Sequence, residues 1–203
     1  VTNSVFRRLC KNLGADVLTT EFVSAEGILH RNERTRRYIE FQPDERPVGV
    51  QLFGANPERL AEAAKAVIDW VGPDFIDLNF GCPVNKVVSR NGGSSLLKDC
   101  PLLKKVAATG KPVIMSTGMA TLAEIDEAVR TLREAGCTQL ALLKCTSAYP
   151  SLPEDMNLRT IPHLAEAFHV PVGLSDHTLG IAFPVAAVAL GACIIEKHLT
   201  PRR

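Results

Sequence analysis

Short apolar runs recur along the chain, and each is rich in Val, Ile and Leu and introduced by Gly, Pro or Asp. Strands of a parallel sheet that are buried on both faces are continuously apolar, so we interpret these runs as strands. The seven predicted strands are residues 15–22, 46–53, 73–80, 111–117, 138–145, 170–177 and 192–198.

Apolar residues at helical spacing occupy the segments between the predicted strands. The predicted helices are residues 2–14, 56–71, 121–136 and 161–169. Thr121 and Glu124 form a capping-box pattern at the start of the third helix, and Gly136 is a suitable C-terminal cap. Strands that alternate with helices in units of about 25 to 35 residues predict an α/β fold with a parallel sheet covered by helices.

Polar or glycine-rich clusters follow the predicted strands. In a barrel all strand ends meet on one rim, whereas an open doubly wound sheet gathers ligand residues at one switch point. Seven clusters favour a TIM-type (β/α)8 barrel. A first strand and a last helix are not found, so we expect an incomplete barrel of about seven strands, whose open edges predict self-association. The clusters are Glu21, Gln51, 79–86, 116–119, 145–150, 175–178 and 196–198.

Composition and charge add only broad constraints. With 203 residues, 46% of them hydrophobic, the chain can bury the core of one domain or of two small ones. A net charge of +1 gives no whole-chain argument for nucleic acid or an anionic membrane. Six cysteines without C-x-x-C spacing indicate reduced thiols, and no long apolar run or signal peptide is found. We therefore expect a cytoplasmic protein with no membrane partner.

A basic cluster, RNERTRR at residues 31–37, leaves two interpretations open. It can be a solvated helix end, which we favour, or it can contact phosphate groups. Neither interpretation decides the function of the chain.

The segment DLNFGCPVNKVVSRNGGSSLL at residues 77–97 is the most distinctive in the first half. Together with VTNSVFRRL, TTEFVSAEGIL and VGVQLFG upstream, it resembles the tRNA-dihydrouridine synthases, FMN-dependent barrel enzymes, over about residues 1–103. The resemblance implies that Cys82 is the general acid that protonates the uracil ring of tRNA. It also implies that Gln51 contacts the flavin ring and Asn79 the base beside it. Without the motif, Cys82 is equally well explained as a small buried hydrophobe.

The FMN phosphate motifs of that family do not follow residue 103. No K-x-R strand, N-G-D turn or G-R-G turn is found there, and the A-P-M segment of the first strand is also missing. Because such turns supply the donors that hold a phosphate, we expect FMN to bind weakly.

The second half carries a different set of motifs from about residue 101, including KPVIMSTGM, LLKCTSAYP, PVGLSDHT and ACIIEKHLT. They are similar to the sialic acid synthases, and within that family to the pseudaminic acid synthases, which condense phosphoenolpyruvate with an amino sugar on a metal-dependent barrel. The resemblance implies that His177 and His198 are metal ligands. It also implies that phosphoenolpyruvate or the sugar contacts Ser116, Ser147, Tyr149 and Ser175.

The two histidines follow consecutive apolar strands, so in a parallel barrel their side chains can converge on one rim. Two imidazoles suit a divalent transition ion such as Mn²⁺ and leave positions for water and the substrate aldehyde. Outside such a motif, a lone histidine is usually a structural residue or a hydrogen-bonded surface group. Hydroxyl groups in runs such as S-T-G and C-T-S otherwise make strand-end hydrogen bonds.

Each half lacks parts of the site of the family that it resembles. On the synthase side, a lysine and a serine before the G-K-P strand and an antifreeze-like domain are not found. We therefore interpret residues 1–203 as a single barrel domain of two half-barrels, 1–103 and 104–203, recombined at 101–103 without an intact parental site. We expect a two-histidine metal site to persist without turnover. Two enzymatic alternatives stay open, an FMN-dependent tRNA-dihydrouridine synthase and a phosphoenolpyruvate-dependent sialic or pseudaminic acid synthase.

Overall fold

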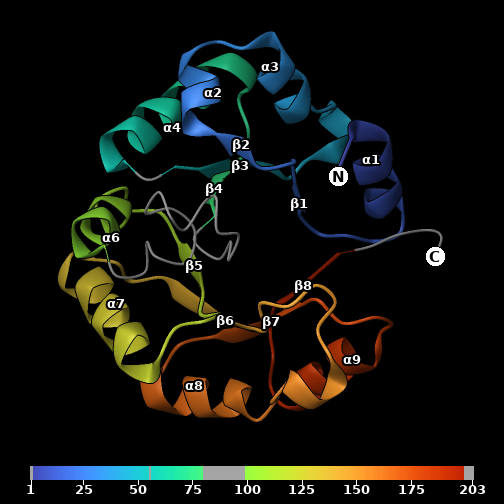
Figure 1. The fold of residues 1–203 in the computed structure, drawn as a ribbon, viewed down its shortest axis with the longest axis vertical. Helices are drawn as coiled ribbons and strands as arrows, with labels where there is room; N and C mark the ends of the chain where they lie inside the picture. Colours follow the sequence, from blue (N-terminus) through green and yellow to red (C-terminus); the bar gives the residue numbers. More distant parts are fainter. Residues whose placement is uncertain (1, 55, 80–98, 199–203) are drawn as a thin grey trace. The chain divides into compact units, whose positions relative to one another are not determined.

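The computed structural model describes residues 2–54, 56–79 and 99–198 (Figure 1). The contacts between residues divide this part of the chain into two compact units. The described residues of unit 1 run to Asn79, and those of unit 2 begin at Asp99. No helix in these ranges is long and apolar enough to cross a membrane. Each unit contains its own parallel sheet.

The sheet of unit 1 is centred on β3 (Val48–Phe53), with β4 (Phe75–Leu78) on one edge. Two short strands, β1 (Leu18–Thr19) and β2 (Val23–Ser24), pair with β3 along its other edge. All four strands are parallel.

The two short strands are one strand path interrupted by an extra residue. Leu18 lies opposite Val48 and Val23 lies opposite Leu52, so five steps along one strand match four along the other, as in a β-bulge. Thr20 lies within the bulge, where its backbone N–H donates to the carbonyl of Gly49 (3.0 Å). The predicted strand 15–22 contains β1 alone, and the bulge separates β1 from β2, which begins one residue beyond the predicted range.

Helices cover one face of the unit 1 sheet. They are α1 (Ser4–Asn12), α2 (Ala25–Leu29), α3 (Glu33–Ile39) and α4 (Pro57–Val71), with a 3-10 turn, η1 (Pro43–Glu45). α4 begins after Asn56, whose side chain accepts a hydrogen bond from the Arg59 backbone, and ends at Gly72 in the left-handed conformation. The apolar core includes Ile28, Val50, Leu52, Leu60 and Val67.

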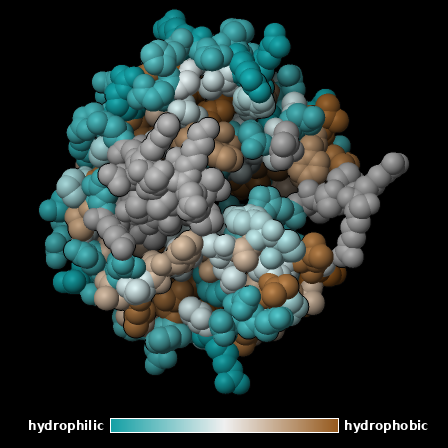
Figure 2. Space-filling view, in the orientation of Figure 1, coloured by the Kyte–Doolittle hydropathy of each residue, from teal (hydrophilic) through white to brown (hydrophobic). Residues whose placement is uncertain are grey.

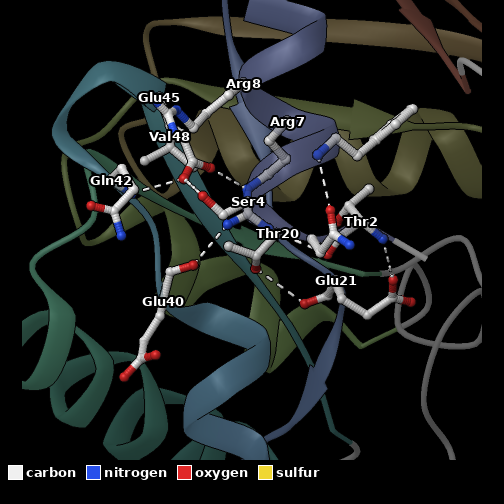
Figure 3. Close-up of polar contacts among 12 residues, drawn as sticks. Thr2, Ser4, Arg7, Arg8, Thr20, Glu21, Glu40, Gln42, Glu45 and Val48 are labelled. Carbon is white, nitrogen blue, oxygen red and sulfur yellow. Dashed lines mark hydrogen bonds and ion pairs between the residues drawn. The ribbon is translucent and has the colours of Figure 1, made fainter. Parts of the chain in front are cut away.

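A buried ion pair holds α1 to the segment before β3 (Figure 3). Arg7 Nε lies 2.5 Å from Glu45 Oε2, and the two side chains are 3% and 0% exposed. Arg7 also donates to the carbonyl of Glu40 (2.7 Å). The Glu45 carboxylate accepts hydrogen bonds from Ser4 Oγ (2.5 Å) and the Gln42 backbone (2.8 Å). The charge of Glu45 is therefore compensated inside the unit.

The basic cluster at residues 31–37 lies largely on α3. Arg36 forms ion pairs along the helix with Glu33 (3.8 Å) and Glu40 (3.1 Å). Exposed pairs at this spacing are typical of a solvated helix face, so these contacts support the favoured interpretation of the cluster.

Unit 2 contains four parallel strands in the order β5 (Val113–Ser116), β6 (Leu140–Cys145), β7 (Val172–Asp176) and β8 (Ile195–Lys197). Its helices are α6 (Cys100–Ala107), α7 (Leu122–Glu134), α8 (Thr160–Phe168) and α9 (Ala182–Ala189), with a 3-10 turn, η3 (Pro153–Asp155). They line one side of the sheet in Figure 1.

Side chains of β6 and β7 alternate between the helix-facing side of the sheet and the opposite side. Leu142 and Leu174 belong to the apolar core that the helices cover. Lys144 and Asp176 come two residues later and therefore lie on the same side. Ser175 lies on the opposite side. The ends of these strands thus present polar groups on both faces of the sheet.

The predicted capping box begins α7. Thr121 Oγ1 accepts a hydrogen bond from the Glu124 backbone (3.3 Å), and the Glu124 carboxylate accepts one from the Thr121 backbone (2.8 Å). Gly136 follows the helix with a φ of 91°, a conformation that glycine adopts without strain. The sequence signals for both ends of this helix are confirmed.

The surface around α9 is apolar, which Figure 2 shows as brown residues near that helix. Leu179, Ile181, Val185 and Val188 are all exposed. α7 differs, because its outward face carries ion-paired residues such as Asp126 and Arg130. The exposed surface of α9 is therefore less polar than that of α7.

The α/β class and the parallel strands predicted from the sequence are confirmed. All seven predicted strands contain an observed strand, and the predicted helices correspond to α1, α4, α7 and α8. The two sheets belong to separate compact units, so the incomplete (β/α)8 barrel stays a prediction. The single-domain organisation with a boundary at 103 also stays a prediction.

Candidate functional site

Three aromatic rings gather where β6, β7 and β8 end in unit 2. The centroid of Tyr149 lies 4.1 Å from that of His177 and 5.8 Å from that of His198. The two imidazole centroids are 5.6 Å apart. The structure therefore brings together both predicted metal ligands and one predicted substrate contact.

His177 is held through both its ring and its backbone. Its Nδ1 lies 2.8 Å from the carbonyl oxygen of Thr146, and its own carbonyl accepts a hydrogen bond from the Ser151 backbone (3.0 Å). A carbonyl can only accept, so Nδ1 must carry the proton of the neutral ring. The Nε2 lone pair is then available to a ligand.

His198 follows β8 directly and is exposed. Partial burial of the ring and the neighbouring His177 lower the pKa of His198. The neutral imidazole, which is the form that binds metal ions, is therefore favoured at neutral pH.

Ser175 is buried at the end of β7. It lies opposite Cys145 of β6 and Glu196 of β8 in the register of the sheet. Cys145, Ser175 and Glu196 thus form one row across the three strands. His177 and His198 come two residues after Ser175 and Glu196, so they lie on the same face in the next row. Glu196, which was not among the predicted site residues, is therefore placed beside them.

Ser116 and Ser147 belong to the strand ends nearer β5. Ser116 is the last residue of β5, and Ser147 follows β6. A Cβ built on Gly118 would lie only 2.7 Å from Ser147 Oγ and closer still to Cys145 Sγ. Gly118 thus leaves the space that these side chains occupy. Burial raises the pKa of the Cys145 thiol, so Cys145 is unsuited to act as a nucleophile.

An ion pair lies on the helix-facing side of the same strand ends. Lys197 Nζ contacts the Asp176 carboxylate and also donates to the carbonyl of Thr178 (2.8 Å). Asp176 accepts further hydrogen bonds from the backbone (3.0 Å) and hydroxyl (3.1 Å) of Thr178. Burial alone would raise the pKa of Asp176, but these bonds outweigh it and lower the pKa.

Sequence reasoning missed this supporting layer. Asp176 and Lys197 each precede a predicted histidine ligand, and Lys144 is a charged residue inside an apolar strand. That pattern was a usable signal, because a charged residue in a buried strand requires a partner.

The histidine pair suits a divalent ion, although it supplies only two ligands. No group of three or more His, Cys, Asp or Glu residues that could hold a metal occurs within the described ranges. Imidazole nitrogens bind such ions at about 2.1 Å, and the 5.6 Å between the centroids of His177 and His198 is short enough for both rings to reach one ion. The remaining positions would be left to water and substrate.

Unit 1 places Gln51 and Asn79 together at the ends of β3 and β4. Gln51 Nε2 donates to Asp77 Oδ2 (2.5 Å), and Asn79 Nδ2 donates to Gln51 Oε1 (3.1 Å). Each end of the Gln51 amide thus makes one hydrogen bond inside unit 1, and the expected contacts of Gln51 and Asn79 with a flavin and a base stay predictions. Cys82 lies outside the described residues, so its role stays a prediction.

A family model described as the NeuB family matches residues 74–203. The match begins before the predicted junction at 101–103. Among solved structures, the sialic acid synthetase of Leptospira borgpetersenii aligns with 96% of this chain and 66% of its own, with a TM-score of 0.61. At 24% identity this likeness concerns the fold alone.

Curated relatives extend the similarity to both halves of the chain. An uncharacterized protein of Methanocaldococcus jannaschii is 59% identical over 192 residues, which cover 94% of this chain and 55% of its own. The N,N'-diacetyllegionaminic acid synthase of Legionella pneumophila is 32% identical over 94% of this chain and 57% of its own. The pseudaminic acid synthase of Helicobacter pylori is 43% identical over 59% of this chain and 34% of its own. Similarity to synthases is therefore not confined to residues after 103.

A probable tRNA-dihydrouridine synthase of Aquifex aeolicus is also similar, with 37% identity over 70% of this chain and 47% of its own. The chain spans about half the length of most of these curated relatives. Recombination of two parental halves is not confirmed by these matches.

Proposed function

Because the chain belongs to the NeuB family, we propose that the strand ends of unit 2 form part of a site that condenses phosphoenolpyruvate with an amino sugar. The supporting observation is the cluster of Tyr149, His177 and His198. The incomplete TIM-type (β/α)8 barrel predicted from the sequence is the arrangement that we propose for this site.

A divalent ion such as Mn²⁺, bound by His177 and His198, would supply a Lewis acid that polarises the sugar aldehyde. The surroundings of the two ligands favour metal binding in different ways. Thr146 holds the proton of His177 on Nδ1, and the lowered pKa of His198 favours its neutral ring.

Hydroxyl groups around the histidines are suited to hold polar substrates. Ser175 is buried one row below His177, and Ser116 and Ser147 lie toward β5. Tyr149 is exposed, and its ring lies against His177. We propose that these four side chains orient the carboxylate and phosphate of phosphoenolpyruvate and the hydroxyl groups of the sugar.

Metal binding can be tested by titrating Mn²⁺ into the protein while the melting temperature is measured. A ligand that binds the native state stabilises it, so the wild type should melt at a higher temperature as Mn²⁺ is added. His177→Ala and His198→Ala should abolish the shift, whereas His163→Ala, an exposed histidine on α8, should keep it. An equal shift in all four proteins would contradict the proposed site.

Turnover requires a separate assay, because a metal site can persist without it. Phosphate release from phosphoenolpyruvate, with Mn²⁺ and 2-acetamido sugars, measures the condensation. Release that depends on both histidines supports the synthase. Metal binding without release instead supports the second candidate, a recombined scaffold of residues 1–103 and 104–203 that has kept only the ion site.

Reduction of tRNA with FMN is the remaining alternative, supported by the similarity to the Aquifex aeolicus protein. Gln51 and Asn79, which this alternative places beside the flavin and the base, are joined by a hydrogen bond at the ends of β3 and β4 (3.1 Å). Addition of FMN to the purified protein tests this alternative directly, because bound flavin changes its absorbance spectrum.

A further inference from the structure

Thr146 connects several contacts around His177. Its carbonyl accepts hydrogen bonds from His177 Nδ1 (2.8 Å) and from Ser151 Oγ (3.1 Å). Its hydroxyl accepts a hydrogen bond from Lys144 Nζ (2.5 Å) and donates to the carbonyl of Asp155 (3.3 Å). The residue that sets the His177 tautomer is thus itself fixed by its own side chain.

Lys144 is the charged residue in this set of contacts, and it is buried. Its exposed fraction is 6%, and it lies on the helix-facing side of β6, two residues after the core residue Leu142. Burial lowers the pKa of Lys144, and the charges of Cys145 and Asp176 partly oppose that effect. Burial of an amine costs free energy unless the amine is hydrogen-bonded. The hydrogen bond to Thr146 supplies such a partner for Lys144.

The Ser151 contacts show what the anchored segment holds. Ser151 Oγ bonds to the carbonyls of Thr146 and Ala148 (2.9 Å), and its backbone N–H donates to the carbonyl of His177. Hydrogen bonds from residues 146–155 therefore hold both the ring and the backbone of His177. The hydroxyl of Thr146 joins this segment to the end of β6 through Lys144.

We propose that Lys144 is a positioning residue that fixes the Nδ1–H tautomer and the ring orientation of His177 through Thr146. Lys144 lies on the helix-facing side of β6, and its hydrogen bond is made to Thr146. This tautomer leaves the Nε2 lone pair free to bind a metal ion, and that role of the tautomer rests on the proposed function. The tautomer itself does not, because it is a property of the protein without metal.

The test measures the His177 tautomer in metal-free protein labelled with ¹⁵N-histidine. The two ring nitrogens have different chemical shifts in each tautomer, and His177→Ala identifies the signals. The wild type should show the proton on Nδ1. Lys144→Met and Thr146→Val should give a mixture of tautomers, whereas Thr146→Ser, which keeps the hydroxyl, should restore the wild-type signals.

A matched control separates positioning from a general loss of stability. Thr117 is a buried threonine of unit 2, and its hydroxyl, like that of Thr146, donates to a backbone carbonyl, that of Leu143 (3.0 Å). Thr117→Val should therefore leave the His177 signals unchanged. A wild-type ring protonated on Nε2, or unchanged signals in folded Lys144→Met, would overturn the proposal. If Lys144→Met does not fold, the comparison of Thr146→Val with Thr146→Ser decides.

Affinity for Mn²⁺, measured by calorimetry, gives a second readout. Loss of a group that orients a metal ligand typically weakens binding by about 10- to 100-fold, and we expect this range for Lys144→Met. If the wild type binds no Mn²⁺, the proposed function fails while the tautomer result stands. If Mn²⁺ binds but the tautomer is insensitive to Lys144 and Thr146, the positioning role fails alone.

Discussion

Asp176 and Lys197 form an ion pair directly behind the two histidines of unit 2. They lie opposite each other in β7 and β8, and His177 and His198 are the next residues of the two strands. The Asp176 side chain is fully buried, while Lys197 is 22% exposed. The pair therefore joins the two strand ends on one face of the sheet while the imidazoles lie on the other.

Replacement of Lys197 by methionine should destabilise unit 2. The Asp176 carboxylate would remain buried with the hydrogen bonds of Thr178 but without its ion-pair partner, and removal of one member of a buried pair costs about 3 kcal/mol or more. Chemical denaturation measures the loss. Lys104→Met, an exposed lysine on α6, should change the free energy of unfolding by less than about 0.5 kcal/mol. If Asp176→Asn did not recover part of the loss in the Lys197→Met background, the charge explanation would be wrong.

Arg7 and Arg8 offer neighbouring arginines in opposite environments. Arg7→Met leaves the fully buried Glu45 carboxylate without its cation, so we expect a loss of about 3 to 5 kcal/mol. Arg8 pairs with Asp44 at the surface, where both side chains are more than half exposed. Arg8→Met should therefore cost no more than about 1 kcal/mol. Equal losses for the two variants in urea denaturation would contradict the burial argument.

Stability at low pH should depend on Asp74. Hydrogen bonds from the Val48 backbone (2.8 Å) and from Arg46 (2.6 Å) lower the pKa of Asp74, the backbone bond contributing most. A carboxyl whose pKa is lower in the folded state stabilises the protein above its unfolded pKa of about 3.9 and loses this effect as the pH falls through the folded value.

Asp74→Asn should consequently be less stable than the wild type at pH 6, and the difference should narrow below about pH 4. Denaturation curves at a series of pH values measure that difference. A gap that stayed constant down to the lowest pH at which the protein folds would show that the carboxyl charge is not involved.

Gly118→Ala should disturb the strand ends of unit 2. The added methyl group would lie 2.7 Å from Ser147 Oγ and closer to Cys145 Sγ, and overpacking of this kind costs about 1 to 3 kcal/mol. Cys145→Ala removes the nearer atom, so the double variant should regain part of the lost melting temperature. No recovery in the double variant would mean that the sulfur atom is not the source of the clash.

Much of the fold was predictable because its signals are local. Apolar runs located the strands, and the Thr121 and Glu124 pair located the start of α7. The bulge at Thr20 was not predictable, since it depends on how the strand pairs with β3. The Arg7 and Glu45 pair joins residues 38 positions apart, and no local pattern links them.

The residues of the candidate site were also predictable only in part. His177, His198 and Tyr149 were predicted from motifs, and the structure brings their rings together. Lys144 and Thr146 were missed because their importance arises from a contact with His177, 31 residues away from Thr146. Motifs identify groups that face a ligand, whereas the groups that hold them are identified by the fold.

The alternation of side chains in β7 limits how this part of the gene can change. Ser175 and His177 share one face of the strand, while Leu174 and Asp176 share the other. Loss of a single residue between Val172 and Asp176 would exchange the two sets, turning the imidazole into the helix layer and the carboxylate outward. Insertions and deletions should therefore be confined to the flanking loops, and viable variants of this strand should differ only by substitution.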